Sequence, residues 1–274
     1  MLLIDLNQIM YANMFMNLKT LGHLDENALR YMILNSLRAY NMKFHYGEVI
    51  LACDSPNSWR RDIFPFYKAS RRKARAESLI NWKDIFASFA IIKAELAEYF
   101  PYTILEIDGA EGDDVIAVMS TLIADKTMIL SSDEDFVQLH SGMIGQFNPV
   151  HKKKVEKDNI PTFLKEHIIA GDSGDGVPNV CSADDTFVMG KRQNKIGHKM
   201  RSYLLETDPT LYPSTEQRNY FRNKELIDLS CIPERITSQI KASYLNKPER
   251  HKRKLFDYFY DKKLTKFINS IQEF

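Results

Sequence analysis

Short runs of aliphatic and β-branched residues alternate with longer amphipathic patterns over the first half of the chain, and this alternation constrains the fold most. The runs that we expect to be strands are Leu2 to Leu6, Glu48 to Cys53, Thr103 to Ile107, Thr127 to Ser131 and Met143 to Phe147. The patterns between them repeat apolar residues at helical spacing over Asn27 to Phe44, Trp82 to Tyr99 and Asp113 to Ala124. The sequence therefore predicts an α/β fold with a central, mostly parallel sheet flanked by helices.

The second half of the chain has a different pattern. The polar stretch HKKKVEKD at 151–158 predicts a turn or an edge hairpin, and from about Pro161 the β-branched runs disappear. Helices are expected at Ile196 to Leu205, Thr215 to Leu229 and Pro248 to Lys262, with a loop over Gly171 to Asp185. We therefore expect an α/β core over residues 1–157 and a helical region over residues 158–274.

Bulk composition excludes several classes of protein. The chain has 274 residues, of which 44% are hydrophobic and 27% charged, as in a globular protein. Its apolar stretches fall short of the roughly 20 residues that span a bilayer, and MLLIDLNQ lacks the features of a signal peptide, so we expect a cytoplasmic protein without a membrane partner. Cys53, Cys181 and Cys231 form no CxxC pair, so neither a disulfide framework nor a zinc site is expected.

The formal net charge of +1 hides a strong segregation of charge. Residues 59–75 hold seven Lys and Arg residues against Asp62 alone, which gives 7 − 1 = +6. Acidic residues gather elsewhere, in EGDD at 111–114, SDED at 132–135 and GDSGD at 171–175. A basic block is typical of a surface that contacts nucleic acid, although a solvated helix explains Arg72, Lys73 and Arg75 about as well.

Acidic residues also follow the predicted strands at the points where these end. Asp5 ends the first strand, Asp54 follows the second, and the remaining members of the set are Glu111, Asp113, Asp114, Asp133 and Asp135. In an open α/β sheet such side chains converge at the carboxyl edge. Helix capping explains any one of them, but several carboxylates at one edge repel each other unless a cation neutralises them. Ligands that are all oxygen favour Mg²⁺ or Mn²⁺, and two such ions can support phosphodiester hydrolysis.

Other chemistries find less support in the sequence. It contains neither a GxxxxGK[ST] loop nor a GxGxxG motif after a strand, so transfer of phosphate from ATP is not expected. Ser131, Ser132 and His140 lie near one another in the chain, but no nucleophile elbow or orienting triad surrounds them. We interpret His140 as a structural residue.

Taken in order, these motifs resemble the 5′ nuclease family, the flap-endonuclease superfamily, over essentially the full length of the chain. The likeness is greatest to its T-even phage ribonuclease H group. It is carried by Asp5, the CD at 53–54, WRRD at 59–62, YKASR at 67–71, KAR at 73–75, EGDD, SSDEDF at 131–136, GDSGD and the closing NSIQEF. The resemblance implies a PIN-like core, a helical arch over residues 56–80 and a duplex-binding segment similar to helix-turn-helix in the helical region.

The resemblance also implies the residues of a two-metal site. The first Mg²⁺ or Mn²⁺ ion would be held by Asp54, Glu111, Asp113 or Asp114, Asp133 and Asp135, with support from Asp5, and the second would add Asp172 and Asp175. Asp54, Asp133 and Asp135 would be catalytic together with Lys68. As a compact charge, Lys68 would face the phosphate at which negative charge develops.

The arch and the helical region would contact the nucleic acid. The implied contact residues are Arg60, Arg61, Tyr67, Lys68, Arg71, Arg72, Lys73 and Arg75 in the arch, with Tyr67 stacked on a base, and Lys191, Arg192, Lys195 and Lys199 farther along. The chain departs from the family at 177–190, which reads VPNVCSADDTFVMG instead of a Gly-rich turn. Asp184 and Asp185 therefore stand where duplex phosphate or a monovalent cation is expected.

The activity implied is that of a metal-dependent 5′–3′ exonuclease and flap endonuclease that removes RNA primers in phage DNA replication, in the cytoplasm of the host. Its partners would be branched or nicked DNA and RNA–DNA duplex with a free 5′ end, and we expect a monomer. A single-stranded-DNA-binding protein and a sliding clamp remain open as partners, although Met1 directly before the first strand leaves no N-terminal extension for a clamp. Two alternatives remain: a structure-specific binding protein that lost catalysis, and another carboxylate metalloenzyme, such as a toxin-type ribonuclease or a phosphatase.

Overall fold

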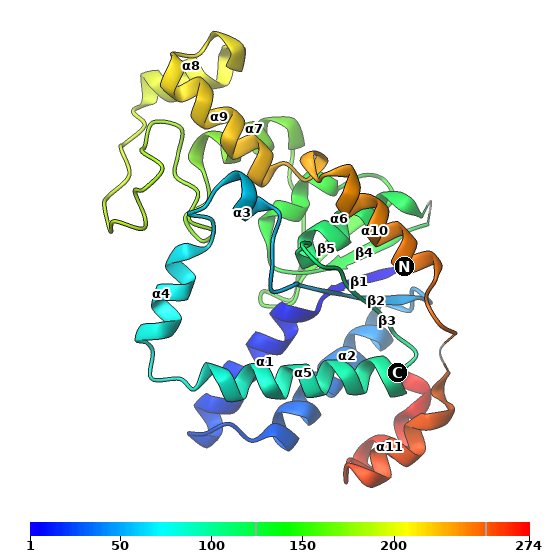
Figure 1. Ribbon diagram of the computed structural model, residues 1–274. Coiled ribbons are helices and arrows are strands. Elements are labelled where there is room, and N and C mark those ends of the chain that lie inside the picture. Colours follow the sequence, from blue (N-terminus) through cyan, green and yellow to red (C-terminus); the bar gives the residue numbers. More distant parts are fainter. Residues whose placement is uncertain (124, 250) are drawn as a thin grey trace. The chain divides into compact units, whose positions relative to one another are not determined.

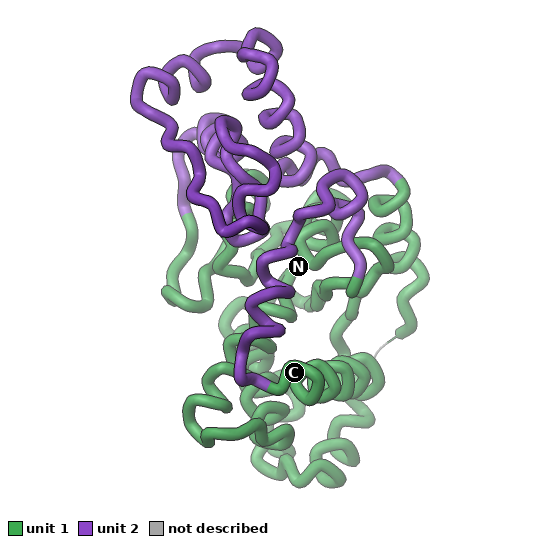
Figure 2. Tube along the Cα trace, turned by 60° about the vertical axis from the view of Figure 1, so that its left-hand side comes forward, with its two compact units in different colours: residues 1–56, 81–155, 235–274 green, residues 57–80, 156–234 purple. Residues whose placement is uncertain are grey.

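A computed structural model describes residues 1–123, 125–249 and 251–274 of the chain. Ala124, at the end of one predicted helix, and Arg250, inside another, lie outside the described residues. Two compact units are distinguished in Figure 2: a sheet unit of residues 1–56, 81–155 and 235–274, and a helical unit of residues 57–80 and 156–234. This grouping differs from the expected division at 157, because residues 57–80 belong to the helical unit and residues 235–274 to the sheet unit.

The sheet unit is built on a six-stranded sheet in the order β3-β2-β1-β4-β5-β6. All neighbouring strands are parallel except β5 and β6, which form an antiparallel edge hairpin. The predicted mostly parallel sheet and the hairpin at HKKKVEKD are therefore confirmed. The strand bounds are β1 Leu2–Asp5, β2 Val49–Cys53, β3 Thr103–Glu106, β4 Thr127–Leu130, β5 Ile144–Asn148 and β6 Lys153–Val155.

Helices cover both faces of this sheet. Figure 1 shows α1, α2 and α5 on one face and α6 and α10 on the other. Their bounds are α1 Leu6–Leu21, α2 Glu26–Phe44, α5 Trp82–Tyr99, α6 Gly112–Leu122, α10 Glu234–Leu245 and α11 Leu255–Asp261, with 3₁₀ turns η1 Glu134–Leu139, η4 Lys252–Lys254 and η5 Thr265–Glu273. β1 is completely apolar and buried up to Asp5, because it lies inside the sheet with helices on both sides.

Polar side chains begin the long helices. The carboxylate of Asp5 accepts a hydrogen bond from the backbone N–H of Gln8, and Asp25 and Asn81 cap α2 and α5 in the same way. Such caps satisfy backbone donors that the first turn of a helix leaves without partners. Asp5 therefore ends β1 and caps α1, so the chain turns from strand to helix at the carboxyl edge of the sheet.

The last segment of the chain is held in the sheet unit by a buried ionic cluster. Glu95 on α5 accepts hydrogen bonds from Arg30 on α2 and from the hydroxyl of Tyr258 on α11, at 2.6 and 2.9 Å, and Lys262 lies 2.6 Å from its other oxygen. Burial would raise the pKa of Glu95, yet these three donors hold it below its usual range.

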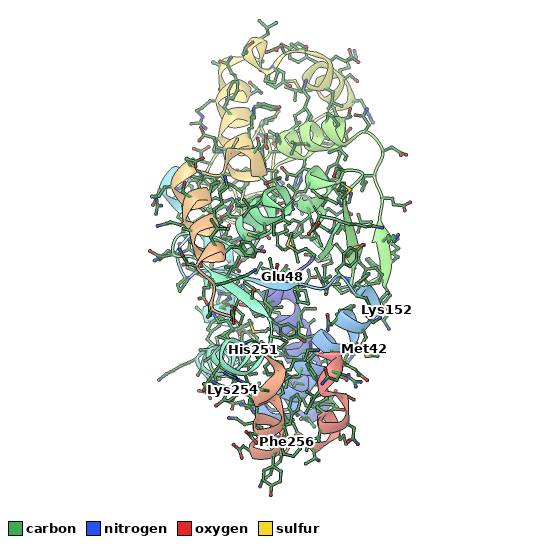
Figure 3. All side chains as sticks on the ribbon, turned by 90° about the vertical axis from the view of Figure 1, so that its right-hand side faces the viewer. Met42, Glu48, Lys152, His251, Lys254 and Phe256 are labelled. Carbon is green, nitrogen blue, oxygen red and sulfur yellow. The ribbon has the colours of Figure 1, made fainter. Side chains whose placement is uncertain are left out.

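A second anchor joins α10 to the sheet. Glu48, labelled in Figure 3, accepts hydrogen bonds from Tyr244 at 2.7 Å and Thr103 at 3.2 Å and pairs with Lys247. Because both anchors tie residues beyond 240 to elements of the sheet unit, the end of the chain folds with the sheet.

The helical unit contains its own hydrophobic core. Its elements are α3 Arg60–Ile63, α4 Ala69–Glu77, α7 Ile160–Ala170, α8 His198–Glu206 and α9 Ser214–Ile227, with 3₁₀ turns η2 Pro209–Leu211 and η3 Leu229–Cys231. Phe64 and Tyr67 pack into the core formed by α7, α8 and α9, which explains why residues 57–80 group with this unit. Within the described residues, no helix is long and apolar enough to cross a membrane.

Residues 171–197 connect α7 to α8 through turns and an isolated bridge between Asp172 and Val177, as the predicted loop required. This connection is pinned by amides from α9. Asn219 donates to the carbonyls of Val180 and Ser182, at 2.8 and 3.1 Å, and Asn223 donates to those of Ile168 and Pro178, both at 2.9 Å. A long segment without regular structure is thus fixed by buried hydrogen bonds instead of a Gly-rich turn.

Candidate active site

The carboxyl edge of the sheet brings together the acidic residues of the sheet unit. Strands β2, β1 and β4 are adjacent and parallel, so their carboxyl ends open on the same edge. Asp5 ends β1, Asp54 follows β2 and Asp133 follows β4. The chain therefore positions these three carboxylates by strand order, as the sequence predicted for the ligand-binding edge of an α/β sheet.

The start of α6 contributes the EGDD acids. Asp54 Oδ1 accepts a hydrogen bond of 2.8 Å from the backbone N–H of Gly112, where an added Cβ would lie 3.3 Å from the same oxygen. Glu111 caps α6, and Asp114 Oδ2 accepts a 2.9 Å hydrogen bond from the backbone N–H of Glu111, forming a capping box. Asp114 is fully buried and Asp113 half-buried. Of the two alternatives in the predicted ligand set, Asp113 is thus the more accessible.

The loop after β4 is ordered around Asp133. Ser131 is completely buried, and its hydroxyl donates to Asp5 Oδ2 at 3.2 Å while accepting a hydrogen bond of 3.1 Å from the backbone N–H of Asp133. Asp133 Oδ1 in turn accepts from the backbone N–H of Asp135 at 2.9 Å. Asp5 therefore supports the loop from the first strand while the side chain of Asp133 remains exposed at the edge.

These acids fit a hard divalent cation by the chemistry of their donors. The donors are carboxylate oxygens from β1, the ends of β2 and β4 and the first turn of α6, and a cation such as Mg²⁺ prefers oxygen. The nearby thiol of Cys53 is completely buried, and burial raises its pKa, so it does not supply a thiolate. The chemistry of these donors therefore fits a hard divalent cation better than a soft ion.

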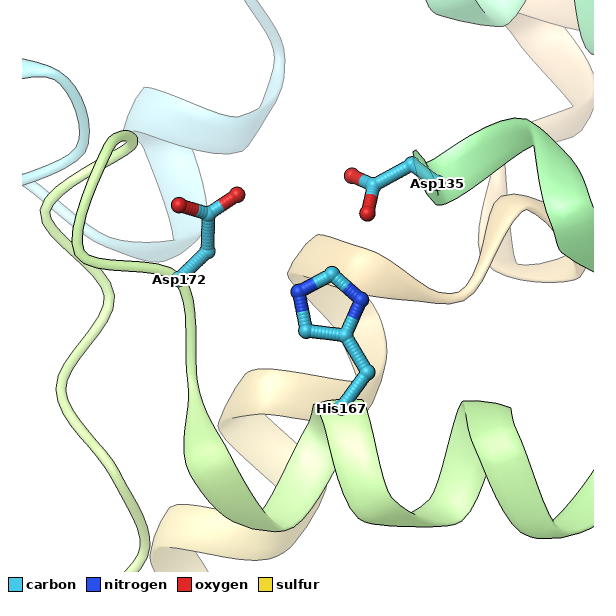
Figure 4. A group of neighbouring side chains, drawn as sticks. All are labelled: Asp135, His167 and Asp172. Atoms are coloured by element: carbon cyan, nitrogen blue, oxygen red, sulfur yellow. The ribbon is translucent and has the colours of Figure 1, made fainter. Parts of the chain in front are cut away.

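In the helical unit, Asp172 has a neighbour that the sequence analysis missed. His167 lies on the last turn of α7, and a ring nitrogen and a carboxylate oxygen of Asp172 are within 4.8 Å of each other (Figure 4). The only signal in the sequence was its position, one helical turn before the GDSGD motif. An imidazole beside a carboxylate can orient it by hydrogen bonding or share a ligand position.

Asp175, also in the helical unit, is surrounded by cations and a hydroxyl from residues 67–71. The Tyr67 hydroxyl donates to its Oδ2 at 2.6 Å, Lys68 Nζ lies 3.4 Å from the same oxygen, and Arg71 pairs with Oδ1. Burial would raise the pKa of Asp175, but Lys68, Arg71 and the Tyr67 hydroxyl hold it below its usual value. The YKASR and GDSGD motifs are therefore joined within this unit.

Two of the predicted nucleic-acid contacts need correction. Tyr67 is 2% exposed and its ring belongs to the core of the helical unit, so it is not available to stack on a base. Arg60 is 3% exposed, its Nε donates to the carbonyl of Leu226 at 2.9 Å, and its guanidinium lies over the ring of Trp59. Both side chains hold α3 and the base of the arch in place, because hydrogen bonds and packing inside the unit use them.

The other basic residues lie nearer to the surface. Arg71, Arg72 and Lys73 are exposed, and Arg61 and Arg75 are half-buried. Farther along the chain Lys191, Arg192, Lys195 and Lys199 are also exposed. An exposed basic helix and an exposed basic loop are each able to contact phosphate groups without desolvating a buried partner.

Asp184 and Asp185 lie in the segment 177–190 that departs from the family pattern, and basic side chains of the helical unit neutralise them. Asp184 Oδ1 accepts a hydrogen bond of 2.7 Å from Arg218 and one from Arg222, and Asp185 pairs with Lys191 at 3.1 Å. Arg222 also donates to the carbonyl of Pro178 at 3.0 Å. Asp184 therefore helps to pin the loop to α9, and Asp185 pairs within the loop itself. From the sequence alone, both acids were expected to lie where duplex phosphate or a monovalent cation binds.

Comparison with known proteins decides the family. A model described as "5'-3' exonuclease, N-terminal resolvase-like domain" matches residues 1–167, and one described as "T4 RNase H, C terminal" matches residues 160–274. The chain belongs to the 5′–3′ exonuclease family. This 5′ nuclease is 33% identical to the ribonuclease H of Enterobacteria phage T4, over 99% of its own length and 95% of that protein. The resemblance to the T-even phage ribonuclease H group is thus confirmed, and the chain is a phosphodiester hydrolase.

A more distant relative agrees with this assignment, and solved structures share the fold. This 5′ nuclease is 28% identical to a 5′–3′ exonuclease of Buchnera aphidicola, over 79% of its own length and 65% of the relative. A solved structure titled "Divalent metal ions (zinc) bound to T5 5'-exonuclease" shares its fold, with a TM-score of 0.65 at 16% identity, and covers 90% of this chain and 98% of the other. A T5 flap endonuclease solved as a pseudo-enzyme-product complex with DNA and metal ions gives 0.63, also at 16% identity, over 89% and 97% of the two chains.

Proposed function

We propose that this 5′ nuclease hydrolyses phosphodiester bonds near the free 5′ end of RNA or DNA annealed to a DNA template. It would act both as an exonuclease and at flaps, and its role would be removal of RNA primers during phage DNA replication in the host cytoplasm. The proposal rests on the likeness to the T4 phage protein named ribonuclease H, which spans 99% of this chain and 95% of that protein. Other relatives are named exonuclease and flap endonuclease.

One structural observation carries the proposal. Carboxylates that follow β1, β2 and β4 and begin α6 open on one edge of a parallel sheet, and hydrogen bonds hold Asp54 to Gly112 and Asp5 to Ser131. Helix caps alone would not require this number of acids at one edge. The mutual repulsion of these carboxylates is removed when a divalent cation binds, which is the expected state during catalysis.

As the resemblance implies, Asp54, Glu111, Asp113 or Asp114, Asp133 and Asp135 would hold the first ion with support from Asp5, and the second ion would add Asp172 and Asp175. When bound, Mg²⁺ or Mn²⁺ would lower the pKa of a water molecule and neutralise charge on the phosphate. The protein itself orients Asp133 through Ser131 and Asp5. It also fixes the backbone of Lys68 through a 2.7 Å hydrogen bond from its N–H to the carbonyl of Asp175.

Arg61, Lys68, Arg71, Arg72, Lys73 and Arg75 would guide the 5′ strand, and Lys191, Arg192, Lys195 and Lys199 would contact the duplex. Branched or nicked DNA and RNA–DNA duplex would be the binding partners of a monomer. A role in replication would also bring the protein into contact with a single-stranded-DNA-binding protein and a sliding clamp.

The test is a cleavage assay with three 5′-labelled substrates: a flap, a nicked duplex and an RNA-primed duplex, each with Mg²⁺ and with EDTA. We expect Mg²⁺-dependent release of short 5′ products from all three. The ranking of the rates decides between RNA and DNA and between exonuclease and flap cutting. Binding without cleavage in Mg²⁺ and in Mn²⁺ would instead indicate a structure-specific binding protein.

A further inference from the structure

Gln146 on β5 is a buried polar residue to which neither the sequence motifs nor the proposed reaction assigns a role. Its side chain is 1% exposed. The amide nitrogen donates to the backbone carbonyl of Ser131 at 2.9 Å and to that of Asp133 at 2.6 Å. Each of the two amide hydrogens is therefore donated to a backbone carbonyl, one to that of Ser131 and the other to that of Asp133.

A histidine completes the hydrogen bonds of this amide. His140 Nε2 lies 3.0 Å from Gln146 Oε1. Because the amide nitrogen must face two carbonyl oxygens, the amide oxygen must face His140, and the ring must donate its Nε2–H. His140 is thus a structural residue, as expected, but its contact leads directly to the loop that carries Asp133.

A second glutamine holds the same loop from the other side. Gln8 lies on the first turn of α1, and its Nε2 donates to Ser132 Oγ at 2.6 Å while its Oε1 accepts from the backbone N–H of Ser132 at 2.8 Å. Gln8 N–H in turn donates to Asp5 Oδ1 at 3.0 Å. Residues 131–133 are therefore clamped by side-chain amides from two different elements.

We propose that Gln146 and Gln8 are positioning residues that aim Asp133 at the metal ion, with His140 completing the hydrogen bonds of Gln146. This inference rests on the proposed metal site. Beyond β4 the chain leaves the sheet, so side chains must satisfy the buried backbone groups of the loop, and the two glutamines do so in one fixed conformation. Groups that orient a metal ligand in this way change metal affinity by about 10- to 100-fold when they are lost.

The experiment compares Gln146→Met, Gln8→Met and a matched control, Asn148→Ala. Asn148 is a buried amide on the same strand, and its Oδ1 accepts from the backbone N–H groups of Val150 and His151, both at 2.9 Å, so it serves the β5–β6 turn and not the Asp133 loop. For each variant, the Mn²⁺ dissociation constant is measured by calorimetry without nucleic acid, and the melting temperature in EDTA.

We expect Gln146→Met and Asn148→Ala to lower the melting temperature in EDTA, because each removes buried hydrogen bonds. Only the two glutamine variants should weaken Mn²⁺ binding, by about 10- to 100-fold. If Gln146→Met does not fold, Gln8→Met decides, since it leaves the sheet untouched. Wild-type affinity for Mn²⁺ in the glutamine variants would overturn this proposal alone, whereas a wild-type protein that binds no Mn²⁺ would overturn the proposed function as well.

Discussion

Replacing Asp175 with Asn removes a negative charge on which two cations and a hydroxyl converge. Oδ2 accepts from the Tyr67 hydroxyl at 2.6 Å and lies 3.4 Å from Lys68 Nζ, and Oδ1 pairs with Arg71. Asn keeps the size of the side chain but turns one acceptor into a donor. At least one of the three groups then loses its partner.

The expected loss of stability follows from how far the side chains of this cluster are exposed to solvent. The side chains of Lys68 and Asp175 are 13% and 16% exposed, whereas that of Arg71 is 47% exposed, so solvent screens the arginine pair and it contributes at most about 1 kcal/mol. A hydrogen bond to a charged group, such as that from Tyr67, contributes about 1.5 to 3 kcal/mol. We therefore expect Asp175→Asn to lower the free energy of unfolding by about 2 to 3 kcal/mol.

Urea unfolding in EDTA measures this loss without any contribution from metal. The folded-state pKa of Asp175 lies below its unfolded value, so the stabilisation is fully present above the unfolded pKa and is lost as the pH falls through the folded pKa. The difference from wild type should thus be complete at neutral pH and shrink below about pH 4. Arg72→Ala, one residue beyond Arg71, is the control and should change stability by less than about 0.5 kcal/mol. An Asp175→Asn protein as stable as wild type in EDTA would show that these contacts do not stabilise the fold.

Three further predictions concern the arch and the core. Lys68→Ala should lower the single-turnover cleavage rate at saturating enzyme by on the order of 10²- to 10³-fold with little change in binding. A wild-type rate would show that this lysine does not act on the reacting phosphate. The double variant Arg72→Ala and Lys73→Ala should weaken binding and reduce the slope of log affinity against log salt by up to about two, at an unchanged saturating rate; an unchanged slope would count against phosphate contact. Glu95→Gln should destabilise the protein to urea by about 3 kcal/mol, because it leaves buried Arg30 without its main partner, and a loss below about 1 kcal/mol would contradict the buried pair.

Much of the sheet was predictable because each strand is a short apolar run that ends in a polar residue. β1, β2, β3 and β4 begin within one residue of their expected positions, and the acids that follow them lie where parallel strand order requires. α1 was not predicted, because it begins directly after β1 and its sequence LNQIMYANMFMNLKTL has little helical segregation of apolar residues. From the sequence alone, Asp5 fits the end of a strand as well as it fits the N-cap of a helix.

The parts of the site that depend on tertiary packing could not be predicted. Sequence shows that Tyr67 and Arg60 lie in a basic, aromatic block, but only the packed core of the helical unit shows that they are buried. Likewise Gln146 carries no motif, because its contacts to Ser131 and Asp133 depend on the pairing of β4 with β5. Motifs predict the charged groups at a site, whereas the neutral groups that orient them become visible only in the fold.

In the proposed function the acids at the carboxyl edge of the sheet perform the hydrolysis, and the sharpest test of this role is Asp133→Asn. Cleavage of a 5′ flap in Mg²⁺ is measured beside binding of the same substrate in EDTA, with Glu134→Gln, an exposed neighbouring acid, as the control. We predict that Asp133→Asn abolishes cleavage while binding stays within a few fold of wild type, because the basic contacts remain, and that Glu134→Gln cleaves normally. Cleavage by Asp133→Asn at the wild-type rate would show that this carboxylate does not take part in the hydrolysis.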